Sequence, residues 1–305
     1  MERSLRNRLI FGPIMLAALF ALLWFDDWAQ YKTRGWMESR YAAENFRGGV
    51  GGVGLMILLM LILPVATQEL AILFTAERVR PYRILTIVGS AALVLHAFLT
   101  QFPPFRPIAA SSLAFILAFI MLAAALRRAW AKTPNEAIVK IAGTVLSMLY
   151  LGGLAWFLMA IRVKHSAGPH DFHGTTWTIL SVLLMVKFTD IGAYFGGRKF
   201  GRHKLIPWLS PGKTWEGLYF GLATAGLVGA ACAPWIPHVP WWKGFIFGVI
   251  LGGIGQAGDL LESMMKRDAE VKDSGALVPG FGGILDIIDS PMVAAPFAYL
   301  LFSLC

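Results

Sequence analysis

Cysteine and charge are both scarce in this chain. Its 305 residues include two cysteines, Cys232 in an apolar segment and Cys305 at the last position, so the sequence predicts neither a disulfide framework nor a cysteine-based metal site. Charged residues make up 15% of the chain, against about 25% in soluble domains. With 57% apolar residues and a mean hydropathy of +0.63, the composition excludes an ordinary soluble protein and indicates a polytopic membrane protein.

Long apolar runs account for this composition. Helices of about 17–25 apolar residues cross a bilayer, and prolines or charged residues separate such runs along the chain. The runs are 9–25, 50–74, 84–102, 107–126, 138–161, 175–197, 217–237, 241–261 and 284–304. The first run lacks a small-residue cleavage pattern, so we expect it to be retained as a span. We predict an all-α, polytopic integral membrane helical bundle with about nine transmembrane helices, forming a single domain over 1–305.

Basic residues are distributed unevenly between the connecting segments. Placing the N-terminus and every second loop on one side puts 17 of the 27 Lys and Arg residues there. Since the more basic side faces the cytoplasm, we expect a protein of the inner membrane with a cytoplasmic N-terminus. The net charge of +9 fits this bias, and it equally fits contact with anionic lipid and a nucleotide triphosphate. We expect no nucleic-acid partner.

The most polar stretch lies between the last two apolar runs. Asp259, Glu262 and Lys266 would share one face of a helix, and Asp286 and Asp289 one face of the next. Carboxylates at membrane depth are costly and usually functional. If the connection folds back, the two acidic faces meet over one pocket on the predicted cytoplasmic side. Such a pocket suits Mg²⁺, which takes carboxylates together with substrate phosphates.

The same stretch carries a long ordered motif, S-x-x-K-R-x4-K-D-S-G followed by P-G-x-G-G-x-x-D-x-x-D-S. Its residues are Ser263, Lys266, Arg267, Lys272, Asp273, Ser274, Gly275, Pro279, Gly280, Gly282, Gly283, Asp286, Asp289 and Ser290. This pattern resembles the signature of the phosphatidate cytidylyltransferases, the CDP-diacylglycerol synthases. A second block, TDIGAYFGGRKFGRHKL from Thr189 and SPGKTWEG from Ser210, resembles the same family. The signature region thus lies within 187–305.

The resemblance implies transfer of CMP from CTP to phosphatidate, giving CDP-diacylglycerol and pyrophosphate. It implies Mg²⁺ bound by Asp259 and Asp286. Glu262 and Asp289, one turn along each helix, would either hold these ligands in place or supplement them. The predicted catalytic residues are Asp259, Asp286, Asp289, Lys272 and Asp273. The predicted substrate-binding residues are Ser210, Lys213 and Thr214 for phosphatidate, in a lipid-interface loop over 210–217, and Ser263, Lys266, Arg267, Gly280, Gly282 and Gly283.

Several residues also fit plainer roles. Thr214 suits a helix N-cap, with Glu216 in the first turn. Lys187 and Asp190, three residues apart, would either neutralise each other in the bilayer or leave Asp190 lining the polar cavity. Glu69 is a lone intramembrane carboxylate without a visible partner, and we expect it to face a cavity rather than lipid.

Two positions depart from the family pattern. Phe281 stands where the family usually has His, and Ile287 where it usually has Arg; both changes remove a polar or positive group. Three alternatives therefore stay open: a weakened paralogue acting on another lipid phosphate, a transporter, and a scaffold without chemistry. The His165–His173 loop lies on the opposite predicted side, which argues against a zinc site there. The resemblance and the GxxxG spacings favour a homodimer.

Overall fold

The structure, a computed structural model, describes residues 2–44, 48–76, 78–132, 135–164, 174–271, 274–275 and 277–304. Its helices are α1 Glu2–Arg40, α2 Val53–Ala76, α3 Arg83–Leu99, α4 Ala109–Trp130, α5 Ala137–Met148, α6 Leu154–Lys164, α7 Gly174–Phe200, α8 Trp215–Cys232, α9 Trp241–Asp268 and α10 Leu285–Ser303. A two-stranded antiparallel hairpin, β1 Lys204–Ile206 and β2 Ser210–Thr214, lies between α7 and α8. A π-helical turn, Leu149–Gly153, connects α5 to α6. Short 3-10 turns are Ala42–Glu44, Pro103–Ile108 and Ala233–Trp235.

Within the described ranges, eight helical segments are long and apolar enough to cross a membrane. The remaining predicted span corresponds to α3, a shorter apolar helix of 17 residues. At about 1.5 Å per residue it is roughly 26 Å long, slightly less than the ~30 Å hydrocarbon core of a bilayer. Every predicted span therefore coincides with a helix, and the prediction of an all-α membrane bundle is confirmed.

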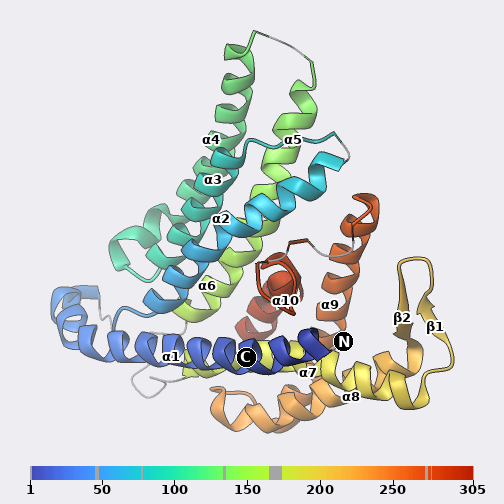
Figure 1. The fold of residues 1–305 in the computed structure, drawn as a ribbon. Helices are drawn as coiled ribbons and strands as arrows, with labels where there is room; N and C mark the ends of the chain where they lie inside the picture. The colour runs from blue at the N-terminus through green and yellow to red at the C-terminus, as the bar shows by residue number, and fades with distance from the viewer. Residues whose placement is uncertain are drawn as a thin grey trace.

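The first helix is longer than the sequence predicts. The predicted loop over 26–49 is wrong, because α1 continues through Asp26 and Asp27 to Arg40. Asp26 does not face water: it is buried and accepts a hydrogen bond from Nε of Arg162, itself fully buried, at 2.8 Å. Since partners inside the protein stabilise the charge, the helix does not have to end there. Figure 1 shows α1 crossing the ends of α2 and α6.

The prediction of a loop over 210–217 is also wrong, because this segment forms β2 and the first turn of α8; its contact with the lipid interface stays a prediction. The register places Thr214 opposite Lys204. Thr214 ends the strand and caps the helix, since its hydroxyl accepts a hydrogen bond from the N–H of Gly217 at 3.1 Å. The hairpin projects beyond the adjoining ends of α7 and α8 (Figure 1).

Small residues bring α7, α8 and α9 together. A Cβ atom at Gly221 would lie 2.7 Å from the Thr189 carbonyl oxygen, and one at Gly252 would lie 2.5 Å from the Thr189 hydroxyl. Glycines at GxxxG spacing thus allow close helix packing here. These glycine faces are used inside one chain, so they lend no support to the homodimer, which stays a prediction.

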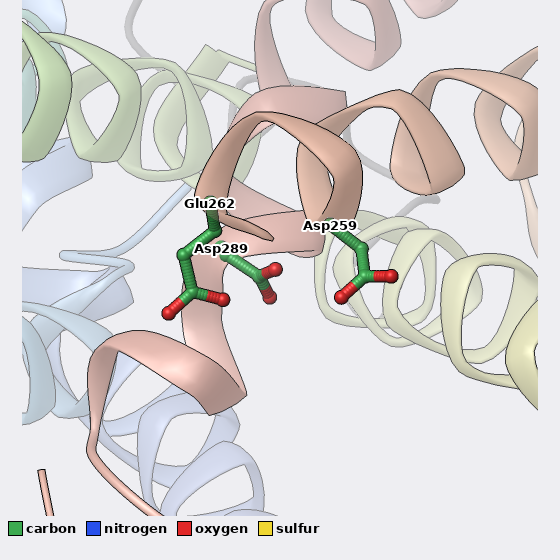
Figure 2. Close-up of side chains that lie close together, drawn as sticks. All are labelled: Asp259, Glu262 and Asp289. Carbon is green, nitrogen blue, oxygen red and sulfur yellow. The ribbon is translucent and has the colours of Figure 1, made fainter. Parts of the chain in front are cut away.

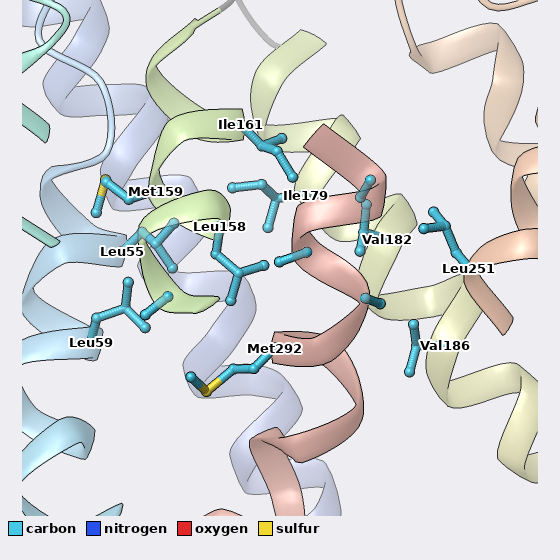
Figure 3. Packing of buried hydrophobic residues seen from close by; sticks show 14 of the residues in the cluster. Leu55, Leu59, Leu158, Met159, Ile161, Ile179, Val182, Val186, Leu251 and Met292 are labelled. Carbon is cyan, nitrogen blue, oxygen red and sulfur yellow. The ribbon is translucent and has the colours of Figure 1, made fainter. Parts of the chain in front are cut away.

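One hydrophobic cluster draws residues from α2, α3, α6, α7, α9 and α10. Leu55 of α2, Leu158 of α6, Val182 of α7 and Met292 of α10 meet in it (Figure 3). The cluster stabilises α2, α7, α9 and α10 against one another, and these four helices carry most of the buried polar residues of the candidate site.

Candidate active site

Three carboxylates from two helices converge: Asp259 and Glu262 of α9, and Asp289 of α10. Each offers an oxygen, and the three oxygens lie within 4.8 Å of one another; in the view of Figure 2, the Asp289 carboxylate lies between the other two. Asp259 and Glu262 share a face of α9 because they are three residues apart. Glu262 and Asp289 are only 1% and 2% exposed. We call this group the acidic triad.

The acidic triad is incompletely hydrogen-bonded. Oε1 of Glu262 and Oδ2 of Asp289 are buried and have no hydrogen-bond partner in the described part of the chain. The hydroxyl of Tyr150, in the π-helical turn, is also buried without a partner and interacts electrostatically with both carboxylates. A buried carboxylate oxygen without a partner is costly, so the triad has free capacity for a ligand that accepts hard oxygen donors.

A polar network connects the hairpin to the acidic triad. Lys213 of β2 forms an ion pair with Asp259 and donates a hydrogen bond to Oε1 of Gln256 at 3.0 Å. Gln256 in turn donates to Oδ1 of Asp190, on α7, at 2.5 Å. Asp190 therefore lines the polar site, and the Lys213 ammonium group is held directly beside the triad.

Asp286, the other predicted metal ligand, is engaged elsewhere. Its Oδ1 accepts from Nζ of Lys266 at 2.8 Å. Its Oδ2 accepts from the N–H of Gly283 at 2.7 Å and from the N–H and hydroxyl of Ser274 at 3.2 and 3.0 Å. Lys266 also pairs with Glu262 at 3.2 Å, so one ammonium group connects α9 to α10. The geometry thus favours Asp286 as a group that stabilises the loop before α10.

The glycine-rich loop before α10 uses its N–H groups internally. Those of Phe281 and Gly282 donate to the Val278 carbonyl at 3.0 and 3.1 Å. That of Gly283 donates to Oδ2 of Asp286. Gly280 and Gly282 have φ values of +89° and +97°, a conformation that glycine adopts without steric cost. A phosphate bound at Gly282 or Gly283 would have to displace these hydrogen bonds.

The other predicted substrate-binding residues lie around the triad in different roles. Arg267 donates from Nε to the Leu209 carbonyl at 3.3 Å, which connects α9 to the hairpin. Ser210 begins β2 and lies opposite Ile206 of β1, and Ser263 is half-buried on α9. The predictions that fall outside the described residues concern Lys272, Asp273 and the His165–His173 loop.

Lys187 makes a contact with another helix that its helical spacing from Asp190 did not predict. Its Nζ donates to the carbonyl oxygen of Ile287, in the first turn of α10, at 3.1 Å. Pro291 stands four residues after Ile287 and has no N–H to close the helical hydrogen bond on that carbonyl. The ammonium group takes the open acceptor, and it interacts electrostatically with Asp190 and Asp289.

Sequence reasoning missed two other members of the site. Gln256 lies three residues before Asp259, so the helical spacing that placed Glu262 beside it would also have found the glutamine. Tyr150 lies more than a hundred residues before the triad, in a π-helical turn. No periodic pattern in the sequence reveals such a turn, because it is a local departure from the α-helical repeat.

Residues 48–305 match the model of the cytidylyltransferase family. The chain belongs to this family. The resemblance seen in the motif residues is therefore confirmed, and α1 lies before the matched region.

Curated relatives carry the same family name. The chain is 36% identical over 173 residues to a phosphatidate cytidylyltransferase of Haemophilus influenzae, covering 55% of this chain and 57% of the relative. It is 34% identical over 236 residues to the chloroplastic phosphatidate cytidylyltransferase 5 of Arabidopsis thaliana, covering 72% and 57%. For a phosphatidate cytidylyltransferase of Pseudomonas aeruginosa the identity is 50% over 131 residues, covering 41% and 47%. The chain thus spans about half the length of these relatives.

Proposed function

We propose that this chain is a membrane-bound phosphatidate cytidylyltransferase that converts CTP and phosphatidate into CDP-diacylglycerol and pyrophosphate. Family membership and the names of the relatives support this substrate pair. The observation that carries the proposal is the acidic triad: two of its buried oxygens lack partners among the described residues, and the Lys213 ammonium group lies at its side. Carboxylates and a cation side by side suit a reaction that must bring two anionic phosphates together.

We propose that Asp259, Glu262 and Asp289 bind Mg²⁺. They fit the ion, because they offer three hard oxygens within 4.8 Å of one another, and two of their buried carboxylate oxygens have no partner in the part of the chain that the structure describes. When bound, Mg²⁺ would neutralise phosphate charge and polarise the reacting phosphoryl group. The contacts of Asp286 with Lys266 and Gly283 favour Asp289 over Asp286 as the ligand from α10.

The reaction requires cations more than it requires a general base. An oxygen of the phosphatidate phosphate attacks the α-phosphorus of CTP, and the bond to the departing pyrophosphate breaks. A phosphate that has lost its second proton is itself a nucleophile. Lys213 would exchange its ion pair with Asp259 for a substrate phosphate, and Lys266 would screen the charge that builds on pyrophosphate. Gln256 would keep Asp190 and the hairpin in place during this exchange.

Incorporation of radiolabelled CTP into chloroform-soluble lipid tests the activity. Purified full-length protein in mixed micelles should transfer label only when both phosphatidate and Mg²⁺ are present. Glu136→Gln, which changes an exposed carboxylate far from the triad in sequence, serves as a control and should transfer label at the wild-type rate. No label in lipid at any Mg²⁺ concentration would overturn the proposal in favour of a scaffold or a transporter.

We also propose that the triad and the N-terminus face the cytoplasm, where CTP is available. The excess of basic residues on that side supports this orientation. Trp208, at the tip of the hairpin, is 73% exposed. In a variant without the native cysteines, Trp208→Cys should react with a membrane-impermeant maleimide in inverted vesicles and not in intact cells. Labelling in intact cells would contradict the orientation without bearing on the activity.

A further inference from the structure

Glu69 is a buried carboxylate of α2, far in sequence from the signature region. It is 6% exposed and lies inside an apolar helix. None of the ion pairs formed by the described lysines and arginines includes it. A carboxylate at such depth has to be stabilised by other donors.

The donors are at the start of α10. Oε1 of Glu69 accepts from the N–H of Ile284 at 3.0 Å, and Oε2 accepts from the N–H of Leu285 at 2.8 Å. The hydroxyl of Ser274 also approaches Oε2, at 3.4 Å. The first N–H groups of a helix have no partner inside it and carry partial positive charge. Glu69 therefore caps α10 from a different helix.

Two glycines make room for this carboxylate. A Cβ atom at Gly275 would lie 2.5 Å from Oε1 of Glu69, and one at Gly283 would lie 2.6 Å from Oε2. Both distances are too short for any side chain. At these two positions the glycine-rich loop is therefore shaped around a carboxylate of the protein itself.

The cap has a direct consequence for the acidic triad. Glu69 accepts from the N–H groups of Ile284 and Leu285 and so fixes the first turn of α10 to α2, while Asp286 of the same turn accepts from the N–H of Gly283. Asp289 lies in the next turn of the same helix, so its buried oxygens are placed by the same contacts.

We propose that Glu69 is a positioning residue for the cation site: by capping α10 it holds Asp289 opposite Asp259 and Glu262. This inference rests on the proposed function, because it assigns Glu69 to the placement of a ligand for the divalent ion. It extends the site to α2, more than 180 residues before Asp259.

Binding of Mn²⁺ to the purified full-length protein, followed by electron paramagnetic resonance, tests this role without relying on activity. Glu69→Ala removes both acceptors, and Glu69→Gln keeps the size but turns one acceptor into a donor that faces an N–H. The matched control is Thr67→Val on the same helix, since Thr67 is also buried and its hydroxyl bonds, among the described residues, to the Leu63 carbonyl alone.

We expect the Mn²⁺ dissociation constant to rise about tenfold in Glu69→Ala, by a smaller factor in Glu69→Gln, and to stay unchanged in Thr67→Val. The Mg²⁺ concentration that gives half-maximal CMP transfer should rise in parallel, whereas KM for CTP at saturating Mg²⁺ should not. Thermal unfolding identifies the variants that are folded.

Wild-type affinity for Mn²⁺ in a folded Glu69→Ala would overturn the inference and leave the proposed function intact. If Glu69→Ala does not fold, wild-type Mn²⁺ affinity in Glu69→Gln would overturn the inference instead. A wild-type protein that neither binds Mn²⁺ nor transfers CMP would instead overturn the proposed function itself.

Discussion

Two of the groups of buried charged residues in the described part of the chain differ in how completely they are paired. Around Arg162, the guanidinium group contacts Asp26 at 2.8 Å and Gln30 at 2.8 Å. The other oxygen of Asp26 accepts from the N–H of Gly54 at 3.0 Å. In the acidic triad, by contrast, one oxygen of Glu262 and one of Asp289 have no partner in the described chain.

The difference separates a structural group from a binding site. A buried ion pair whose hydrogen bonds are satisfied connects helices, here α1 to α6 and α2, and has no capacity for a ligand. Buried carboxylates left partly unpaired are costly to the fold, which is the expected condition of groups reserved for a cation. The two groups should therefore respond in opposite ways to neutral substitutions.

Asp289→Asn should give the largest effect on activity. It keeps the size of the side chain and removes a negative charge from the triad, so we expect CMP transfer to fall about 10²–10³-fold. Stability should be unchanged or higher, since a buried charge without full pairing is gone. Transfer rates and thermal unfolding of the same preparations check both parts. A fully active Asp289→Asn would remove the distinction between the two groups.

Arg162→Met should show the reverse pattern. It leaves the buried charge of Asp26 without its ion-pair partner, and we expect a loss of roughly 3–5 kcal/mol of stability. Transfer per folded molecule should stay near that of the wild type, because Arg162 does not belong to the acidic triad. The double variant Asp26→Asn/Arg162→Met should regain part of the stability. A single variant as stable as the wild type would show that this group is not structural.

Lys187→Met tests a paired cation that lies within the site. Lys187 binds the Ile287 carbonyl and brings positive charge near Asp289. We expect transfer to fall about tenfold. Ile287→Arg, added to this variant, should restore part of the activity by supplying a cation from the same turn of α10. If neither substitution changes the rate, Lys187 does not supply the positive charge that an Arg at position 287 would supply.

Thr214→Ala should have the smallest effect. The hydroxyl caps α8, so its removal should cost about 1 kcal/mol of stability and leave KM for phosphatidate unchanged. An increase of tenfold or more in that KM would favour the predicted contact of Thr214 with the lipid phosphate over its role as a helix cap.

The fold was largely predictable, since apolar runs of sufficient length have few alternatives to helices in a membrane. The errors arose where polar residues find partners far away in sequence. Asp26 and Asp27 suggested the end of a span, but Arg162, 136 residues later, stabilises Asp26 within a continuing helix. The hairpin over β1 and β2 was missed because its strands are three and five residues long.

The site was predictable to the level of the helices that carry it. Helical spacing correctly placed Asp259 and Glu262 on one face of α9, and Asp289 meets them from α10 as expected for converging acidic faces. The motif resemblance assigned the metal to Asp286 and gave Asp289 a lesser role. Their partners point the other way: Asp286 is enclosed by Lys266 and backbone N–H groups, whereas one oxygen of Asp289 is unpaired among the described residues.

The assignment of Asp259, Glu262 and Asp289 to the cation site can be tested by Mn²⁺ titrations of the purified protein and its single variants. We expect Asp289→Asn and Glu262→Gln to weaken Mn²⁺ binding strongly, and Asp286→Asn to weaken it far less. Loss of binding in Asp286→Asn, with wild-type affinity in Asp289→Asn, would show that Asp286 rather than Asp289 is the ligand from α10.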